Sequence, residues 1–89
     1  MLAICVHTWN PKVPGMTQKL FLPNREKFMK DLMAKKVPVR SIYSVFNWEQ
    51  GKGWCIWATD TIERLEEIMA EFPYIHTEVI SVELLPQMM

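Results

Sequence analysis

Residues 2–9 alternate between two sets of side chains, which predicts a β-strand. One set contains Leu2, Ile4, Val6 and Thr8, and the other contains Ala3, Cys5, His7 and Trp9. Both sets are largely apolar up to His7, so we expect both faces of this strand to be covered. Asn10-Pro11 ends the strand, because proline cannot donate to a ladder and constrains the residue before it.

Residues 25–36 change to a helical period. Apolar residues fall at Phe28, Met29, Leu32 and Met33, and these positions form one helical face. The preceding segment 17–22 fits a helical turn or a loop, and Pro23-Asn24 either interrupts it or starts the helix. Val37-Pro38 closes the helix.

The middle of the chain predicts a β-hairpin. Residues 39–48 are rich in β-branched and aromatic side chains, residues 49–53 contain two glycines, and residues 54–58 are entirely apolar. On the first of these strands, the alternation places Tyr43 and Val45 on one face and Ile42 and Phe46 on the other.

Residues 59–63 carry the signature of a helix start. Asp60 is positioned to accept the free backbone N–H groups, and Glu63 to reach back to the cap. Apolar residues then follow at helical spacing as far as Phe72, and Pro73 stops the helix. Residues 75–85 alternate again and predict the last strand.

The resulting order, β-α-β-β-α-β, predicts one α+β domain over residues 1–89 with a ferredoxin-like fold. In this fold four antiparallel strands in the order 4-1-3-2 carry both helices on one face. Whichever set of strand side chains meets the helices, the other set leaves an apolar patch that monomers seldom expose. We therefore expect a homodimer, or a larger assembly of dimers, that pairs two sheets.

Composition narrows the function classes. Ten cations balance ten anions, and this neutral total argues against a polyanion binder. Residues 1–45 carry a net +6 and residues 46–89 a net −6, largely on the two predicted helices, so these helices attract each other within the fold or across subunits. The sequence contains no membrane-length apolar run and no signal peptide, which predicts a cytoplasmic protein without a membrane partner. Its two cysteines and two histidines lack zinc spacing, so we expect neither a metal nor a cofactor.

Residues 70–79 read Ala-Glu-Phe-Pro-Tyr-Ile-His-Thr-Glu-Val. This stretch resembles the end of muconolactone isomerase-type proteins, in which a helix closes with Phe-Pro-Tyr and leads into a strand with an acidic residue before Val. The first strand and the junction at residues 54–60 are similar as well. The chain thus resembles the dimeric α/β-barrel superfamily, which implies a small-molecule cavity between two sheets and an isomerase-like activity.

That resemblance implies a site on one sheet face. Its expected ligand-binding residues are Cys5, Trp9, Tyr43, Trp57 and His76. An isomerase that moves a proton beside a carbonyl needs one group to take the proton and one to return it. We name His7, which titrates near neutral pH, and Glu78 as candidate catalytic residues, with His76 as an alternative partner of His7.

Two other functions compete with this hypothesis. The first is a binding or assembly module without chemistry, in which the aromatic residues form the dimer interface. The second is RNA binding, because Lys52-Gly53-Trp54 matches the start of the third-strand signature of RNA-recognition motifs. That match fails at Cys55 and Ile56, so nucleic acid is not an expected partner.

Overall fold

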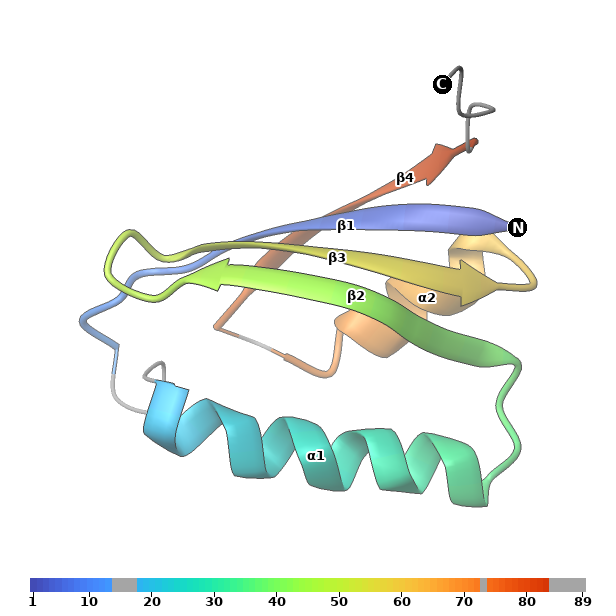
Figure 1. Ribbon diagram of the computed structural model, residues 1–89, viewed down its shortest axis with the longest axis horizontal. Coiled ribbons are helices and arrows are strands. Elements are labelled where there is room, and N and C mark those ends of the chain that lie inside the picture. Colours follow the sequence, from blue (N-terminus) through green and yellow to red (C-terminus); the bar gives the residue numbers. More distant parts are fainter. Residues whose placement is uncertain (14–17, 73, 84–89) are drawn as a thin grey trace, which may run out of the picture.

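Six elements follow one another in the predicted order (Figure 1). The computed structural model describes residues 1–13, 18–72 and 74–83. The elements are β1 (Leu2–Thr8), α1 (Gln18–Ala34), β2 (Val39–Asn47), β3 (Lys52–Thr59), α2 (Ile62–Met69) and β4 (His76–Val82). Among the described residues, no helix is both long enough and apolar enough to cross a membrane.

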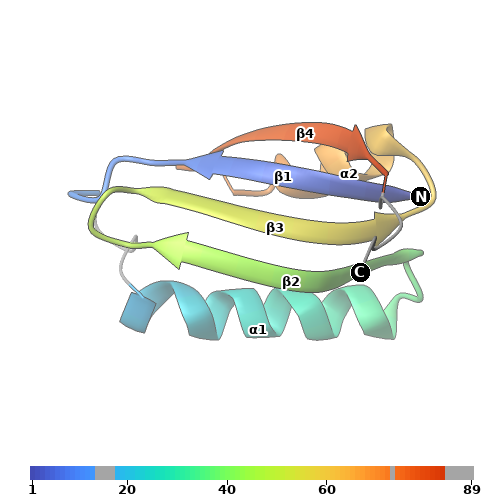
Figure 2. The ribbon, with the colours of Figure 1, turned by 45° about the horizontal axis from the view of Figure 1, so that its top comes forward.

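The four strands form one antiparallel sheet in the order β2-β3-β1-β4. Both helices lie on the same side of it, α1 beneath the β2 edge and α2 beneath β1 and β4 (Figures 1 and 2). The order is the predicted one, so the ferredoxin-like α+β fold is confirmed.

The structure also decides which face of the sheet meets the helices. Ala3, Cys5 and His7 are buried on the helix side, and the register places Gly53 and Thr77 opposite His7 on the two neighbouring strands. Side chains of directly paired residues share a face. The other set, which begins at Leu2 and Ile4, therefore lies on the face without helices, which we call the open face.

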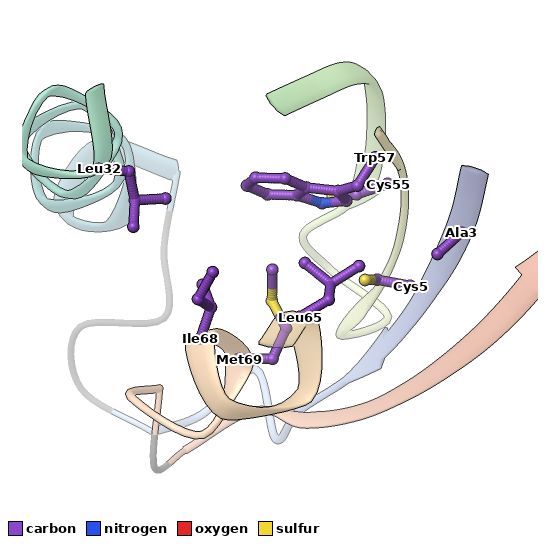
Figure 3. Close-up of a cluster of buried hydrophobic side chains, with 8 residues drawn as sticks. All are labelled: Ala3, Cys5, Leu32, Cys55, Trp57, Leu65, Ile68 and Met69. Atoms are coloured by element: carbon purple, nitrogen blue, oxygen red, sulfur yellow. The ribbon is translucent and has the colours of Figure 1, made fainter. Parts of the chain in front are cut away.

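The core lies between β1, β3 and the two helices (Figure 3). Leu65, Ile68 and Met69 enter it from α2, and Leu32 enters it from α1. The Trp57 ring extends between the two helices.

Helix α1 is longer at its start than predicted. It begins at Gln18 and continues through Pro23, because the side chains of Phe21 and Phe28 pack against the sheet and outweigh the single backbone N–H that proline lacks. Thr17 lies outside the described residues. The expected apolar stripe is wrong at Met33, which is 76% exposed.

The end of α1 has a definite cause. Lys36 adopts a left-handed conformation with φ 55°. Its N–H donates to the Met33 carbonyl over 3.1 Å, and that of Val37 donates to the Leu32 carbonyl over 3.1 Å. This pattern is a Schellman motif, so the helix stops before the predicted Val37-Pro38.

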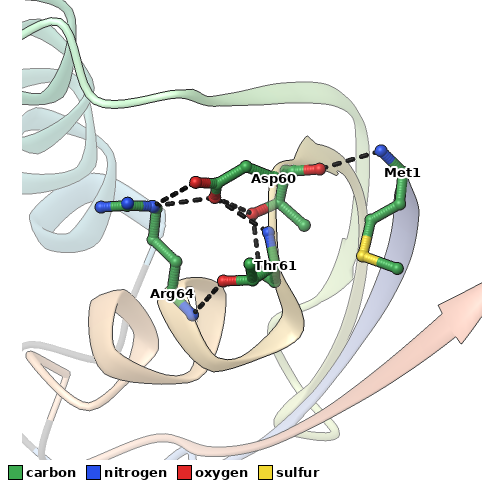
Figure 4. A network of polar contacts seen from close by, with 5 residues as sticks. Met1, Asp60, Thr61 and Arg64 are labelled. Atoms are coloured by element: carbon green, nitrogen blue, oxygen red, sulfur yellow. Dashed lines mark hydrogen bonds and ion pairs between the residues drawn. The ribbon is translucent and has the colours of Figure 1, made fainter.

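The N-cap of α2 is Thr61 and not Asp60 (Figure 4). Thr61 is extended, and its hydroxyl accepts from the Arg64 N–H over 3.2 Å. Asp60 instead accepts from the Thr61 N–H over 2.9 Å and from the Arg64 guanidinium over 2.8 Å. The hydrogen bonds from Arg64 hold the pKa of Asp60 below its usual value.

A β-bulge interrupts the predicted alternation of β2. The register shifts between Ser41 and Tyr43, so Ile42 is an extra residue that is 50% exposed, while Phe46 turns inward. Period two placed Ile42 and Phe46 on one face, and the bulge is the reason that this pairing is wrong. Ser41 and Ser44 both face α1 as a result.

The remaining predictions concern charges and boundaries. Arg64–Asp60 is the ion pair found among the described side chains, which in α1 begin at Phe21, and none of these side chains forms an ion pair with α2. Helix α2 ends at Met69, three residues before the predicted Phe72. Pro73 and the predicted end of the last strand at residues 84–85 lie outside the described residues.

Candidate functional site

Five polar side chains form a connected row on the helix side of the sheet, which we call the polar chain: Thr77, His7, Cys55, Ser44 and Arg25. His7 Nδ1 lies 2.8 Å from the Thr77 hydroxyl, and His7 Nε2 lies 3.2 Å from the Cys55 Sγ. Cys55 is in turn the direct strand partner of Ser44, which lowers the pKa of its thiol. The Arg25 guanidinium donates to Ser44 over 3.3 Å and to Ser41 over 3.2 Å.

Strand pairing brings these groups together from distant parts of the sequence. Thr77 of β4 pairs with His7 of β1, and Ser44 of β2 pairs with Cys55 of β3. The bulge in β2 is required for this, because it brings Ser44 onto the helix side.

Burial determines the protonation states of the polar chain. Burial, assisted by the charge of Arg25, lowers the pKa of His7 to about 4, so the imidazole is neutral at pH 7. Burial also raises the pKa of Cys55, so the thiol keeps its proton; Ser44, Arg25 and Trp57 oppose this shift. A thiol that donates to Nε2 leaves the proton of His7 on Nδ1, from which it donates to Thr77.

Cys5 lies beside this chain without extending it. It pairs directly with Cys55 across β1 and β3, and both thiols are free and buried. Burial and the neighbouring Cys55 raise the pKa of Cys5 to about 12. Both cysteines are therefore protonated at neutral pH.

Four members of the polar chain line a pocket walled by aromatic rings, which we call the aromatic pocket: Thr77, His7, Cys55 and Arg25. Phe21 and Phe28 of α1 contact Phe72, with ring centroids 6.1 and 4.9 Å apart. Trp48 contacts Phe21 at 5.4 Å and Phe46 at 5.1 Å. Trp9 and Trp57 complete the aromatic wall.

The aromatic pocket is narrow. The space between its lining side chains, including the part open to solvent, is about 470 Å³. The free volume of the cavity itself is about 30 Å³. About two water molecules fit into this volume, so a larger occupant requires the lining side chains to move apart.

Gly53 makes room for one wall of the pocket. It pairs with Phe46 on β2 and with His7 on β1, and a Cβ atom at this position would clash with the Phe46 ring. The ring therefore lies across Gly53 and stacks near His7, with centroids 6.2 Å apart.

The structure divides the predicted site between the two faces of the sheet. His7, Cys5, Trp9 and Trp57 are buried on the helix side. Glu78 pairs with Val6 and His76 pairs with Thr8, so both lie on the open face, where Tyr43 is 64% exposed. The structure thus does not bring His7 and Glu78 together, because they differ in strand parity.

Four members of the polar chain were missed from the sequence: Arg25, Ser44, Cys55 and Thr77. A signal existed for Cys55, because a residue two positions from Trp57 shares its strand face. The position of Thr77 in the site follows only from the β1–β4 register, that of Ser44 from the bulge, and that of Arg25 from the early start of α1.

Metal ligation and similarity to known proteins add no further information about this site. The described ranges contain no group of three or more His, Cys, Asp or Glu side chains placed to hold a metal ion. Neither family models nor curated protein sequences match this chain. The isomerase resemblance consequently stays a prediction.

Proposed function

We propose that this protein binds a small organic molecule with a flat apolar body in the aromatic pocket. The observation that carries the proposal is an apolar cavity whose lining also presents four polar side chains, of which Thr77, His7 and Cys55 are directly linked. Ligand sites in proteins have this composition, with mostly apolar walls and a few placed polar groups. The pocket lies within one subunit, between sheet and helices, rather than between two sheets as the resemblance implied.

Binding of an aromatic ring requires the side chains of α1 to move away from the sheet. An apolar cavity that holds benzene measures roughly 150 Å³, well above the present volume. Phe21 and Phe28 are half-buried side chains on a helix that stands further from the sheet than α2. Outward displacement of these two rings is the least costly way to enlarge the pocket, because it leaves the α2 core intact.

His7 is the candidate for chemistry beyond binding. Its imidazole is neutral at pH 7, but a pKa of about 4 makes it a weak base, and its Nε2 already accepts from the Cys55 thiol in the tautomer given above. The isomerase-like reaction also needs a group that returns the proton, and Glu78 lies on the other face of the sheet. We therefore propose binding as the function and leave proton transfer by His7 as a prediction.

Binding is tested by titrating the protein with phenylacetamide, a neutral ring compound, while recording tryptophan fluorescence and NMR signals of the His7 ring. We expect saturable changes at His7 and at the indole of Trp9. Met29→Trp fills the pocket and should abolish them, whereas Trp54→Ala, on the open face, should not. If the shifts map to the open face, or if neither phenylacetamide nor phenylacetate binds, the proposal is wrong.

The open face favours a second function, which is self-assembly. Tyr43, Val45, Trp54 and Ile80 are between 40% and 64% exposed there. Arg40 and Lys52 stand on the side of β2 and β3, and Glu78 stands on β4, so the face offers an apolar centre with opposite charges on its two sides. A second copy of the chain fits such a surface, and this supports the predicted homodimer.

Light scattering at low micromolar concentration tests the assembly. We expect the mass of a dimer, and the mass of a monomer for Trp54→Glu. Met33→Glu introduces the same charge at an exposed position of α1 and should leave the dimer intact. A monomeric wild-type protein would overturn the proposal.

A further inference from the structure

The cation in the aromatic pocket has only neutral partners among the described residues. Arg25 is half-buried, and one nitrogen of its guanidinium donates to the hydroxyls of Ser41 and Ser44. The ion pair found in the described part of the chain lies elsewhere, at Arg64–Asp60. Partial burial of a cation without a counter-ion is unfavourable, and a bound anion relieves this cost.

Two further donors line the same pocket without an acceptor. The indole Nε1 atoms of Trp9 and Trp57 are buried and make no hydrogen bond. Trp57 lowers the pKa of the nearby Cys55 thiol, although its Nε1 makes no hydrogen bond of normal geometry. Both residues are more than nine-tenths buried, so bulk water does not satisfy them.

The pocket lining lacks the opposite kind of group. Among the described lining residues there is one cation, Arg25, and no Asp or Glu. The groups that remain to be satisfied are therefore donors: the free nitrogens of a guanidinium and two indole N–H groups. A ligand complements them by supplying acceptors.

We infer that the ligand of the aromatic pocket is a carboxylate with an apolar ring, held by Arg25 through its carboxylate group. This inference rests on the proposed function and names its ligand class. A planar carboxylate matches the forked donors of arginine, and the ring occupies the space between Phe21, Phe28 and Phe46. The indole N–H groups of Trp9 and Trp57 donate to the remaining oxygen lone pairs.

A matched pair of probes tests the inference. Phenylacetate and phenylacetamide share a ring and differ in charge. By calorimetry at low ionic strength, the wild-type protein should bind phenylacetate about tenfold more tightly, because a charge-assisted hydrogen bond is about twice as strong as a neutral one. Arg25→Gln should reduce this preference to less than about twofold, because it weakens phenylacetate binding more than phenylacetamide binding.

Two control variants isolate the role of the guanidinium. Lys27→Gln removes an exposed charge from the same helix and should keep the preference. Arg25→Lys keeps the charge but loses the fork, and should give an intermediate preference. On the wild-type protein alone, phenylacetate should shift the indole N–H signals of Trp9 and Trp57 downfield, and phenylacetamide should shift them less.

The outcomes separate this inference from the proposed function. If both probes bind equally, or if Arg25→Gln keeps the preference, the carboxylate inference is wrong and the aromatic pocket remains a ligand site. If neither probe binds, both proposals fail. Should Arg25→Gln not fold, then Arg25→Lys and the wild-type indole shifts decide the question.

Discussion

Helices α1 and α2 cover the same face of the sheet, but they are held against it by different contacts. Three residues of the short helix α2 are buried in the core, Leu65, Ile68 and Met69, and Thr61 caps its first turn. Among the described side chains of the longer helix α1, Leu32 alone is buried. The interface between the sheet and α2 is therefore tightly packed, and the interface between the sheet and α1 is loosely packed.

The difference follows from the side chains that each helix directs toward the sheet. Helix α2 presents an aliphatic stripe that packs directly on β3 and β4. Helix α1 presents Phe21, Arg25 and Phe28, whose large rings and charged group hold its backbone away from the strands. One half of the protein is thus an ordinary core, and the other half is the wall of the aromatic pocket.

Removal of a buried leucine from each helix should reveal this difference most strongly. Leu65 is 0% exposed, and we expect Leu65→Ala to lower the free energy of unfolding in urea by about 3–4 kcal/mol. Leu32 is 9% exposed, and its surroundings at the pocket can relax, so Leu32→Ala should cost about 2 kcal/mol. Equal losses would show that α1 is held as firmly as α2.

Acid should destabilise the protein through His7. Because its pKa is 6.5 in the unfolded chain and about 4 in the folded protein, the unfolded chain alone binds a proton between these values. The free energy of unfolding should therefore fall by about 3 kcal/mol between pH 7 and pH 4 through this one residue.

His7→Gln should lack this part of the acid sensitivity when urea unfolding is compared at the two pH values. His76→Gln, at an exposed position, should keep it. Burial is the larger cause of the shift and Arg25 the smaller one, so Arg25→Gln should keep most of it as well. If Arg25→Gln loses most of this acid sensitivity, α1 contributes more to the site than its packing indicates.

Pro23 should account for part of the low stability of α1. Proline in a helix interior costs about 3 kcal/mol relative to alanine, and about 1 kcal/mol is regained because it restricts the unfolded chain. We expect Pro23→Ala to stabilise the protein by about 2 kcal/mol and to slow amide hydrogen exchange along α1. Pro38→Ala, beyond the helix, should do neither.

The cap of α2 should give the smallest effect. Thr61→Ala removes the acceptor of the Arg64 N–H and should lower the free energy of unfolding by about 1 kcal/mol. Thr61→Ser keeps the hydroxyl and should restore most of it. If Thr61→Ala is neutral, Asp60 has taken over the cap, as the sequence predicted.

Local patterns predicted the elements well and the site poorly. The strand periods, the hairpin glycines and the start of α2 gave the element order, and that order is sufficient for a ferredoxin-like fold. The site was misplaced because His7 and Glu78 were combined without their register. Arg25 was overlooked because Pro23-Asn24 suggested that the helix begins just before it, which left Phe21 out of the stripe.

The sequence by itself determined the alternation of strands and helices, since periods of two and 3.6 residues depend on neighbours along the chain. Only the tertiary structure decided which face of the sheet the helices cover, that Thr77 meets His7, and that Ser44 reaches Cys55. These contacts depend on pairing between distant strands and on a bulge at Ile42, neither of which has a local signature. The neutral charge total likewise concealed a single half-buried arginine in a pocket whose described lining has no acid, and that placement carries the inferred ligand class.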